Sequence, residues 1–337
     1  MEWFDDHKKL FLAALLLFVG LTVLVAIIPA LKNERINQAL PGAEPLSQDA
    51  IAGKYIYIAN GCVGCHTQQV RNVDMDKMWG QRPSMAADYA LIRRTDFWRN
   101  TATLMGTERT GPDLTNVGTR QGNKEWNLTH LFNPRILVKE SVMPAYPWLF
   151  EIKKEPAQGD VVVNVPAEYL KGIDGKVVAT KEALQLVAYL QSLKQAKLPD
   201  QIIAPEFLYK KAKTEATAGS DGAATEIDGA ELYGIHCQAC HQANGEGLPG
   251  AFPPLKGSKV VLDDNIDLYV DIIMNGYTAR ESEGYGPMLA VGTNANLSPE
   301  EVAAIMNHER TSWGNNAKKV TPDDVKKVLE AIKSEKK

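Results

Sequence analysis

All four cysteines of this 337-residue chain belong to two copies of one short pattern, Cys-x-x-Cys-His. The first copy spans residues 62–66 (CVGCH) and the second spans residues 237–241 (CQACH). Two thiols at this spacing can add to the two vinyl groups on one edge of a porphyrin, and the adjacent histidine then reaches the iron. Redox disulfides and zinc sites also use Cys-x-x-Cys. Two copies of the longer pattern that take up every cysteine are too improbable for chance, so we predict two covalently bound haem c groups. The predicted attachment and proximal residues are Cys62, Cys65, His66, Cys237, Cys240 and His241.

The sixth iron ligand is predicted to be a methionine in each half of the chain. A methionine thioether opposite the histidine is the usual arrangement in cytochromes c and raises the reduction potential. Met143, in SVMPAYP, and Met288, in YGPML, each stand shortly before the closing helical region of their half. We predict these two as ligands, because most other methionines fill cores. The rival methionines are Met75, Met78, Met85 and Met105 for the first haem and Met274 and Met306 for the second.

Histidines offer an alternative to methionine ligation. His130 and His308 are the candidates, although a histidine outside the motif is more often structural. His236 precedes Cys237 directly and cannot reach round the ring to the opposite face.

Two prolines are candidates for orienting the proximal histidines. A ligating imidazole is held by donating its second N–H group to a carbonyl or carboxylate oxygen. Pro112, in TGPDL, and Pro253, in FPPL, are placed to supply that carbonyl, and a plain turn proline is the alternative.

A membrane anchor is predicted at the N-terminus. Residues 10–31 contain no charge and are flanked by Lys9 and Lys32. A helix of this length covers about 33 Å, enough to cross a hydrocarbon core of roughly 30 Å. A cleaved signal peptide would have a shorter apolar run and a small-residue cleavage site. Because haem is attached on the outer face, we expect a single pass through a bacterial inner membrane, with the haem domains on the periplasmic side.

The chain divides into four parts. Residues 1–32 hold the N-terminus and anchor, 33–195 a first cytochrome c domain, 196–226 a small, polar linker, and 227–337 a second cytochrome c domain with a C-terminal helix. The linker composition predicts flexibility. The fold class is therefore mainly α: one transmembrane helix followed by two all-α haem domains. The net charge of −4 and the lack of a basic stripe exclude nucleic acid as a partner.

Local signals predict several elements within the domains. Ser47 is a plausible N-cap of the helix that leads to the first motif. Residues 181–194 and 298–311 are amphipathic and predict the closing helices, and residues 321–322 begin a last helix. Valine alternates with polar residues between 151 and 180, which predicts a small hairpin.

Three strings in the first half resemble one protein family. They are GCVGCHTQQVR (61–71), RTGPDLTNVGTR (109–120) and LTHLFNPRILVKESVMPAYPWL (128–149). These resemble the monohaem cytochrome c subunit (subunit II) of cbb3-type cytochrome c oxidases, and the resemblance runs from the anchor to about Lys194. It implies the ligands of the first haem given above. It also implies a partner, the haem–copper catalytic subunit, which reduces oxygen and pumps protons.

Residues 228–313 resemble instead a free-standing class I cytochrome c domain, of the kind fused to oxidases and other electron-transfer proteins. The leading interpretation is a non-catalytic subunit that relays electrons from a soluble donor through the second haem, then the first, into the oxidase in aerobic respiration. A linker would let the outer domain swing. The alternatives are the same role in a haem–copper nitric oxide reductase, a tethered dihaem carrier, and a dihaem peroxidase. A peroxidase needs an open iron site, whereas both halves offer a methionine.

Overall fold

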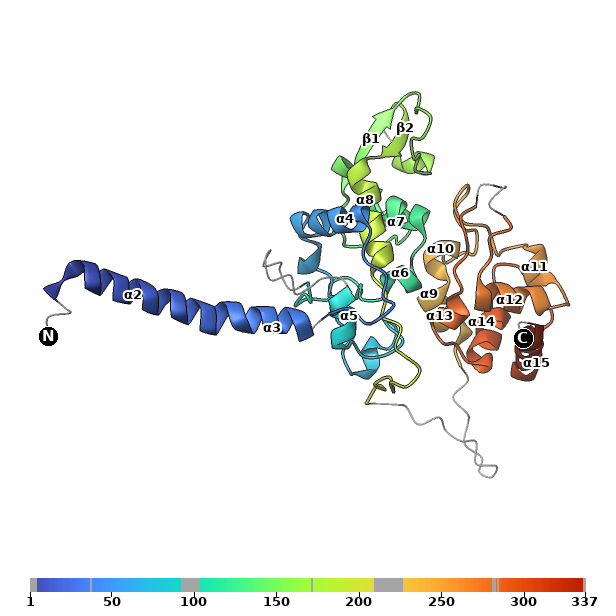
Figure 1. Ribbon diagram of the computed structural model, residues 1–337. Helices are drawn as coiled ribbons and strands as arrows, with labels where there is room; N and C mark the ends of the chain where they lie inside the picture. The colour runs from blue at the N-terminus through green and yellow to red at the C-terminus, as the bar shows by residue number, and fades with distance from the viewer. Residues whose placement is uncertain are drawn as a thin grey trace.

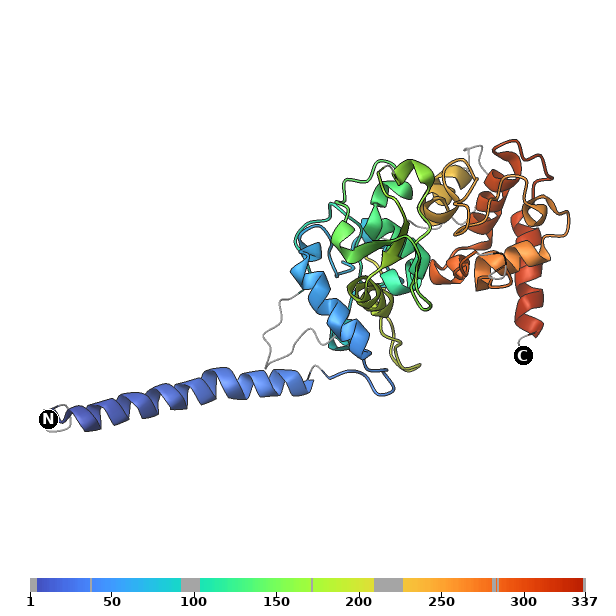
Figure 2. The same ribbon diagram turned by 90° about the horizontal axis from the view of Figure 1, so that it is seen from above.

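The computed structural model describes residues 5–36, 38–91, 104–170, 172–208, 227–280, 283 and 285–335. A long N-terminal helix projects from a body made of two helical domains, and Figure 1 and Figure 2 show these domains side by side. The mainly helical fold class is confirmed.

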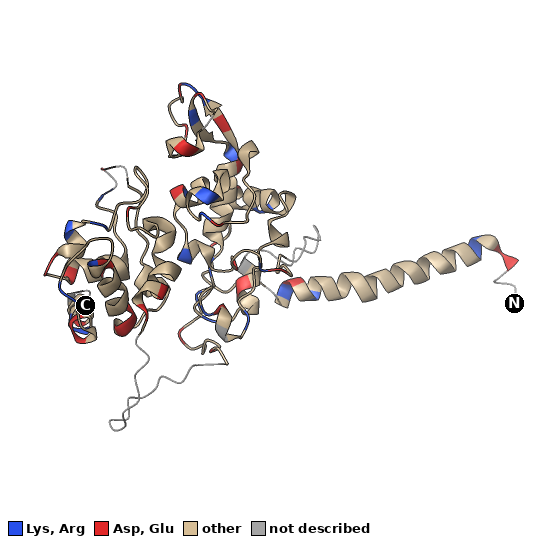
Figure 3. Cartoon of the chain, turned by 180° about the vertical axis from the view of Figure 1, so that it is seen from behind, with Lys and Arg blue, Asp and Glu red and all other residues tan. Residues whose placement is uncertain are grey.

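The projecting helix consists of α2 (His7–Leu21), a π-helical stretch η1 (Thr22–Ile27) and α3 (Ile28–Ile36). Asp6 caps it by accepting a hydrogen bond from the Lys8 N–H group at 3.0 Å. It runs from His7 to Ile36, and its most apolar window of 18 residues has a mean hydropathy of 3.0 and is not buried by the rest of the protein. Figure 3 shows no charged residue in its middle. By length and composition it is able to cross a membrane.

The anchor helix is longer than residues 10–31, and it continues through Pro29. Proline lacks an N–H donor, and its ring would collide with the carbonyl four residues earlier. The preceding turns widen instead, since the Ile28 N–H group bonds the Val23 carbonyl five residues back. A π-helical stretch is one of the usual ways in which a helix absorbs such a break.

The first domain is built around two crossing helices. α4 (Gln48–Ala59) begins at the predicted cap Ser47, and α8 (Lys181–Ser192) is the predicted closing helix. A Cβ atom at Gly53 would lie 1.9 Å from the Gln185 carbonyl oxygen, so only glycine permits this close crossing. The other elements are η2 (Cys62–Gly64), η3 (Asp74–Asp76), α5 (Ala86–Leu91), α6 (Val117–Arg120), α7 (Lys124–Phe132), η4 (Pro134–Ile136), η5 (Pro147–Leu149) and η6 (Ala167–Tyr169).

The predicted hairpin forms with different strands from those expected. β1 (Phe150–Lys153) pairs antiparallel with β2 (Lys176–Ala179), with Phe150 opposite Ala179. The valine-rich segment runs along the other edge of β2, where Val163 N–H donates to the Val177 carbonyl at 2.9 Å. It contributes only an isolated bridge. The alternation of valine with polar residues correctly indicated an extended chain. Which segment pairs with β2 along a full strand was decided by packing.

The second domain repeats the same helix crossing. α9 (Gly229–His236) lies against α14 (Pro299–Thr311), and a Cβ atom at Gly229 would lie 2.1 Å from the Ala304 carbonyl oxygen. Ser298 and Glu301 form a capping box at the start of α14. Its remaining helices are α10 (Gln238–His241), α11 (Lys259–Leu262), α12 (Asp267–Asn275), α13 (Val291–Asn294) and α15 (Pro322–Glu335). The repeated glycine contact indicates one module used twice.

The two domains touch through an apolar cluster. Ile136 and Leu137 of the first domain pack with Leu248, Ala251 and Phe252 of the second, and all five are buried. Residues 196–208 of the connecting segment hold no helix or strand, and residues 209–226 lie outside the described residues.

Candidate haem sites

The first candidate site begins where α4 ends. Gly61 adopts a left-handed conformation (φ 67°), which turns the chain into the short helix η2 that carries Cys62. Cys62, His66, Pro112 and Met143 line one cavity, while Cys65 is exposed and is not part of this lining. Four of the five residues predicted for the first site therefore meet around a single space.

The ring of His66 is held by the neighbouring Gly-Pro pair. Its Nδ1 atom lies 2.8 Å from the Pro112 carbonyl oxygen. Burial lowers the pKa of His66, which favours the neutral imidazole. When Nδ1 carries the proton and donates it to Pro112, the lone pair of Nε2 is available to a metal.

The second candidate site has the same construction. Cys237, Cys240, His241, Pro253 and Met288 all line a second cavity. His241 Nδ1 lies 2.9 Å from the Pro253 carbonyl oxygen, and burial lowers the pKa of this histidine as well. All five residues predicted for the second site are brought together.

The rival methionines divide between the two sites. Met78 lines the first cavity together with Met143, whereas Met75, Met85 and Met105 do not belong to its lining. In the second domain, Met306 is fully buried in the core and Met274 packs against that core. In the second cavity, Met288 is therefore favoured as the iron ligand over Met274 and Met306. In the first cavity, Met143 is favoured over Met75, Met85 and Met105, and Met78 stays a rival.

The candidate histidines also differ in position. His130 lines the first cavity, where its ring stacks on Trp126. His308 contacts Tyr233 and Trp313 and does not line the second cavity.

Three of the four motif thiols have raised pKa values. Burial raises the pKa of Cys62 and of Cys240 to about 11, and it raises the pKa of Cys237 as well. A reactive cysteine of the redox-disulfide type has a lowered pKa, so redox-disulfide chemistry is disfavoured for these three thiols. Within the described residues, the four cysteines are unpaired and no cluster of three or more histidine, cysteine or acidic side chains is suited to a metal ion.

The walls of the first cavity fit a haem with polar substituents. Apolar side chains such as Leu114 and Leu131 face it. Arg120 Nε and His130 Nδ1 are buried in the same wall and have no hydrogen-bond partner among the described residues. A bound group with its own polar atoms would satisfy them. Cys62, His66 and Met143 would hold a haem here, and the haem would supply an iron that cycles between Fe(III) and Fe(II).

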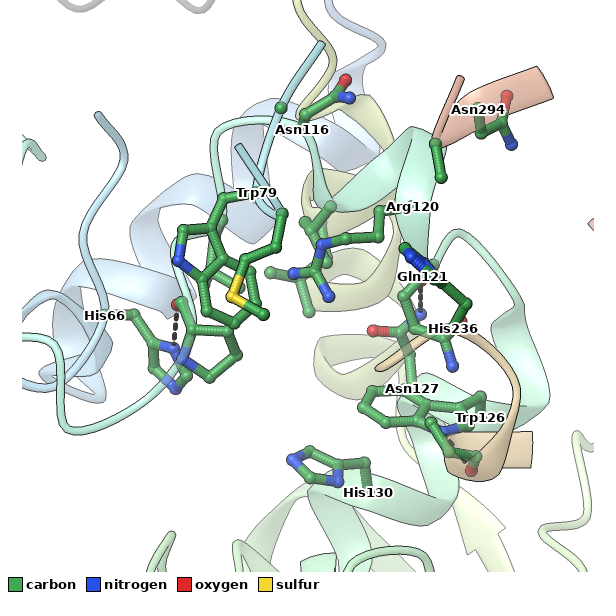
Figure 4. A pocket seen from close by; sticks show the side chains of 18 of the residues that line it. His66, Trp79, Asn116, Arg120, Gln121, Trp126, Asn127, His130, His236 and Asn294 are labelled. Atoms are coloured by element: carbon green, nitrogen blue, oxygen red, sulfur yellow. Dashed lines mark hydrogen bonds between the residues drawn. The ribbon is translucent and has the colours of Figure 1, made fainter. Parts of the chain in front are cut away.

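The two cavities share part of their lining. Arg120, Gln121, His236 and Val291 belong to both. Figure 4 shows Arg120, Gln121 and His236 together at one side of the first cavity, opposite His66. The guanidinium of Arg120 lies 5.0 Å from the ring centre of Trp79, and burial lowers the pKa of Arg120 to about 10. The sequence excluded His236 as a ligand of its own haem but offered no signal that it would reach the other cavity.

Comparison with known families agrees with this construction. The family described as cytochrome c oxidase, mono-haem subunit/FixO, matches residues 1–176, which is just over half of the 337 residues. The chain belongs to the FixO family. A second family, cytochrome c, matches residues 227–313, so a FixO-type unit is fused to a class I cytochrome c domain.

Curated relatives point to the same class of protein. Cytochrome c-552 of Thermus thermophilus is 36% identical over 116 residues, covering 32% of this chain and 77% of that protein. The cytochrome c subunit of a quinone alcohol dehydrogenase from Gluconacetobacter polyoxogenes is 35% identical over 111 residues, which cover 32% of this chain and 24% of the relative. The cytochrome subunit of a fructose dehydrogenase from Gluconobacter japonicus is 27% identical over 124 residues, or 36% and 26% of the two chains.

This FixO-family chain is therefore a membrane-associated c-type cytochrome that works in electron transfer and binds haem c covalently.

Proposed function

We propose that the chain is a dihaem relay subunit of a cbb3-type terminal oxidase. In this proposal Cys62 and Cys65 attach the first haem and Cys237 and Cys240 the second. The iron ligands are His66 with Met143 and His241 with Met288. The observation that carries the proposal is that the histidine of each motif and one predicted methionine line the same cavity, with the histidine ring bonded to a proline carbonyl.

The anchor and the family support the proposed partners. A haem–copper catalytic subunit in the same membrane would accept electrons from the first haem, which lies close to the anchor in the chain. A soluble cytochrome or another periplasmic donor would supply them. The second domain follows the FixO-type unit in the chain. It would therefore provide a second haem at which electrons from the donor enter, which a mono-haem unit lacks. Both haem domains would lie on the periplasmic side of a bacterial inner membrane.

The test is purification of the intact complex through a tag on this chain. We expect two covalent haems per chain by mass, a co-purifying haem–copper subunit, and oxygen reduction. Loss of only one haem equivalent when Cys62→Ala and Cys237→Ala are combined would contradict the haem assignment. A complex that reduces nitric oxide and not oxygen would assign the chain to a nitric oxide reductase instead.

A truncation after Pro199 tests the division of labour between the domains. The shortened chain should still assemble with the catalytic subunit and accept electrons from a small artificial donor, because the FixO-type unit is intact. It should turn over poorly with the natural donor. Failure to assemble would show that the second domain is a structural element, and the relay role would be wrong.

A further inference from the structure

One aromatic residue of the first domain contacts the haem-attachment segment of the second. The Nε1–H group of Trp126, on α7, donates to the carbonyl oxygen of Ala239 at 2.9 Å. Ala239 lies within the second motif, directly before Cys240. The indole is thus hydrogen-bonded to the backbone that would carry the second haem.

The same indole also reaches the first cavity. Its ring stacks on the ring of His130, with centres 4.5 Å apart and planes inclined by 13°. Both rings line the first cavity, and Figure 4 shows them next to each other on one wall. Ala239, Trp126 and His130 therefore form a continuous series of contacts from the second attachment segment to the first haem cavity.

Neighbouring bonds hold the two sites in one orientation. Gln121 Nε2 lies 3.6 Å from Cys240 Sγ, and Asn123 Nδ2 donates to the Pro287 carbonyl, next to Met288, at 3.1 Å. Asn294 Nδ2 donates to the Thr119 carbonyl at 3.0 Å. These polar contacts lie alongside the buried cluster of Ile136, Leu137, Leu248, Ala251 and Phe252. An interface with a buried apolar core and satisfied polar groups around it is typical of specific association.

We propose that the two haem sites are a fixed pair and that Trp126 is the residue that couples them. This inference rests on the proposed function, since it needs a haem at both sites. With a haem bound at each site, one electron would pass across the contact: the iron of the second site would go from Fe(II) to Fe(III), and the iron of the first site from Fe(III) to Fe(II). No bond forms or breaks and no proton moves. The fixed pair replaces the swinging domain that linker composition predicts.

The coupling role is tested with two substitutions in the purified full chain. Trp126→Phe keeps a ring against His130 but removes the Nε1–H donor, whereas Trp126→Leu removes both. The chain is half reduced with a one-electron reductant, and magnetisation exchange between the separate NMR signals of the two haems reports the redistribution of the electron between them. We expect Trp126→Leu to slow this redistribution about tenfold, equivalent to roughly 1.4 kcal/mol of activation free energy. Trp126→Phe should slow it less.

Domain docking is measured separately by hydroxyl-radical footprinting of segments 136–137 and 248–252, whose side chains are buried between the domains. Wild-type chain and the matched control Trp148→Leu, whose side chain is 60% exposed and lines neither cavity, should show the same protection and the same rate. A wild-type rate in Trp126→Leu with protection intact would overturn the coupling role. An unprotected segment in the wild-type chain would overturn the fixed pair. If Trp126→Leu also separates the domains, Trp126→Phe decides between the two explanations. An electron-transfer rate near that of the wild type, with protection intact, supports the aromatic ring as the coupling group. A rate as slow as that of Trp126→Leu contradicts that role.

These outcomes are distinct from failure of the proposed function. The redistribution is measured in the isolated chain, without a catalytic subunit, so it does not depend on which oxidant the complex reduces. A chain with a single haem would be recognised by mass before the kinetic experiment, and that result would contradict the haem count.

Discussion

A Cβ atom at Gly111 would lie 2.2 Å from Cε1 of His66. The backbone of Gly111 packs against the imidazole ring while the next residue, Pro112, accepts a hydrogen bond from the ring at 2.8 Å. The Gly111 N–H group in turn donates to the Cys65 carbonyl at 3.0 Å. The Gly-Pro pair therefore sets both the position and the rotation of the proposed proximal ligand.

Substitution of this glycine should disturb the first haem alone. In Gly111→Ala the added methyl group overlaps the ring of His66, so the ring has to move away from its bond with Pro112. We expect less haem at the first site, or a high-spin iron there, in absorbance spectra of the purified chain. Gly64→Ala is the matched control, since a Cβ atom at that position of the same motif meets nothing within 4 Å. Equal spectra for the two variants would contradict the role of Gly111.

The methionine assignment predicts a stepwise spectral change. Both irons should be low-spin with histidine and methionine ligands, and show the weak absorbance band that reports a sulfur–iron(III) bond. The band should lose about half its intensity in Met143→Ala and the rest when Met288→Ala is added, because each iron loses its only thioether. Met78→Ala tests the rival in the first cavity, and Met274→Ala tests a core methionine of the second domain. An unchanged band in Met143→Ala together with a reduced one in Met78→Ala would move the ligand to Met78.

The stability of the second domain should depend on Arg310. This side chain is 1% exposed and donates to the carbonyls of Val261, Asp263 and Lys318 at 2.7 Å each. Arg310→Met leaves these acceptors without a donor, which costs about 3 kcal/mol or more of unfolding free energy. Chemical denaturation of the full chain, followed at the second haem, measures it. The surface pair of Lys256 with Glu246 is the control, because Lys256→Ala should cost less than about 1 kcal/mol.

A buried carboxyl group should make the second haem sensitive to pH. Glu309 is 3% exposed, lines the second cavity and accepts a hydrogen bond from the Tyr269 hydroxyl. Burial raises the pKa of Glu309 to about 7, so the group is neutral below that pH and anionic above it. A negative charge in the cavity favours Fe(III), and the reduction potential should therefore fall as pH rises through about 7.

Redox titration of the purified chain between acidic and alkaline pH measures this effect. Glu309→Gln should give a second-haem potential that changes little over the same range, because the amide does not ionise. Glu246→Gln is the control, since Glu246 is an exposed residue paired with Lys256. A pH dependence that survives in Glu309→Gln would assign it to another group.

The sequence by itself determined the parts that depend on neighbours in the chain. Cysteine and histidine must be adjacent to serve one haem edge and one iron, so the two motifs are visible in the letters. The anchor follows from a long uncharged run, and the caps at Ser47 and Ser298 follow from side chains that bond N–H groups three residues on. The strings around residues 109–120 and 128–149 carried the family resemblance, which the FixO match confirms.

Tertiary structure alone decided how the two modules meet. Trp126 and Ala239 are 113 positions apart, and His236 lines the cavity of the domain to which it does not belong. No periodicity or spacing encodes such a contact, because it arises only when the surfaces of two folded domains become complementary. The same reason explains why the sequence gives no sign of the buried cluster that Ile136 and Leu137 form with Leu248, Ala251 and Phe252.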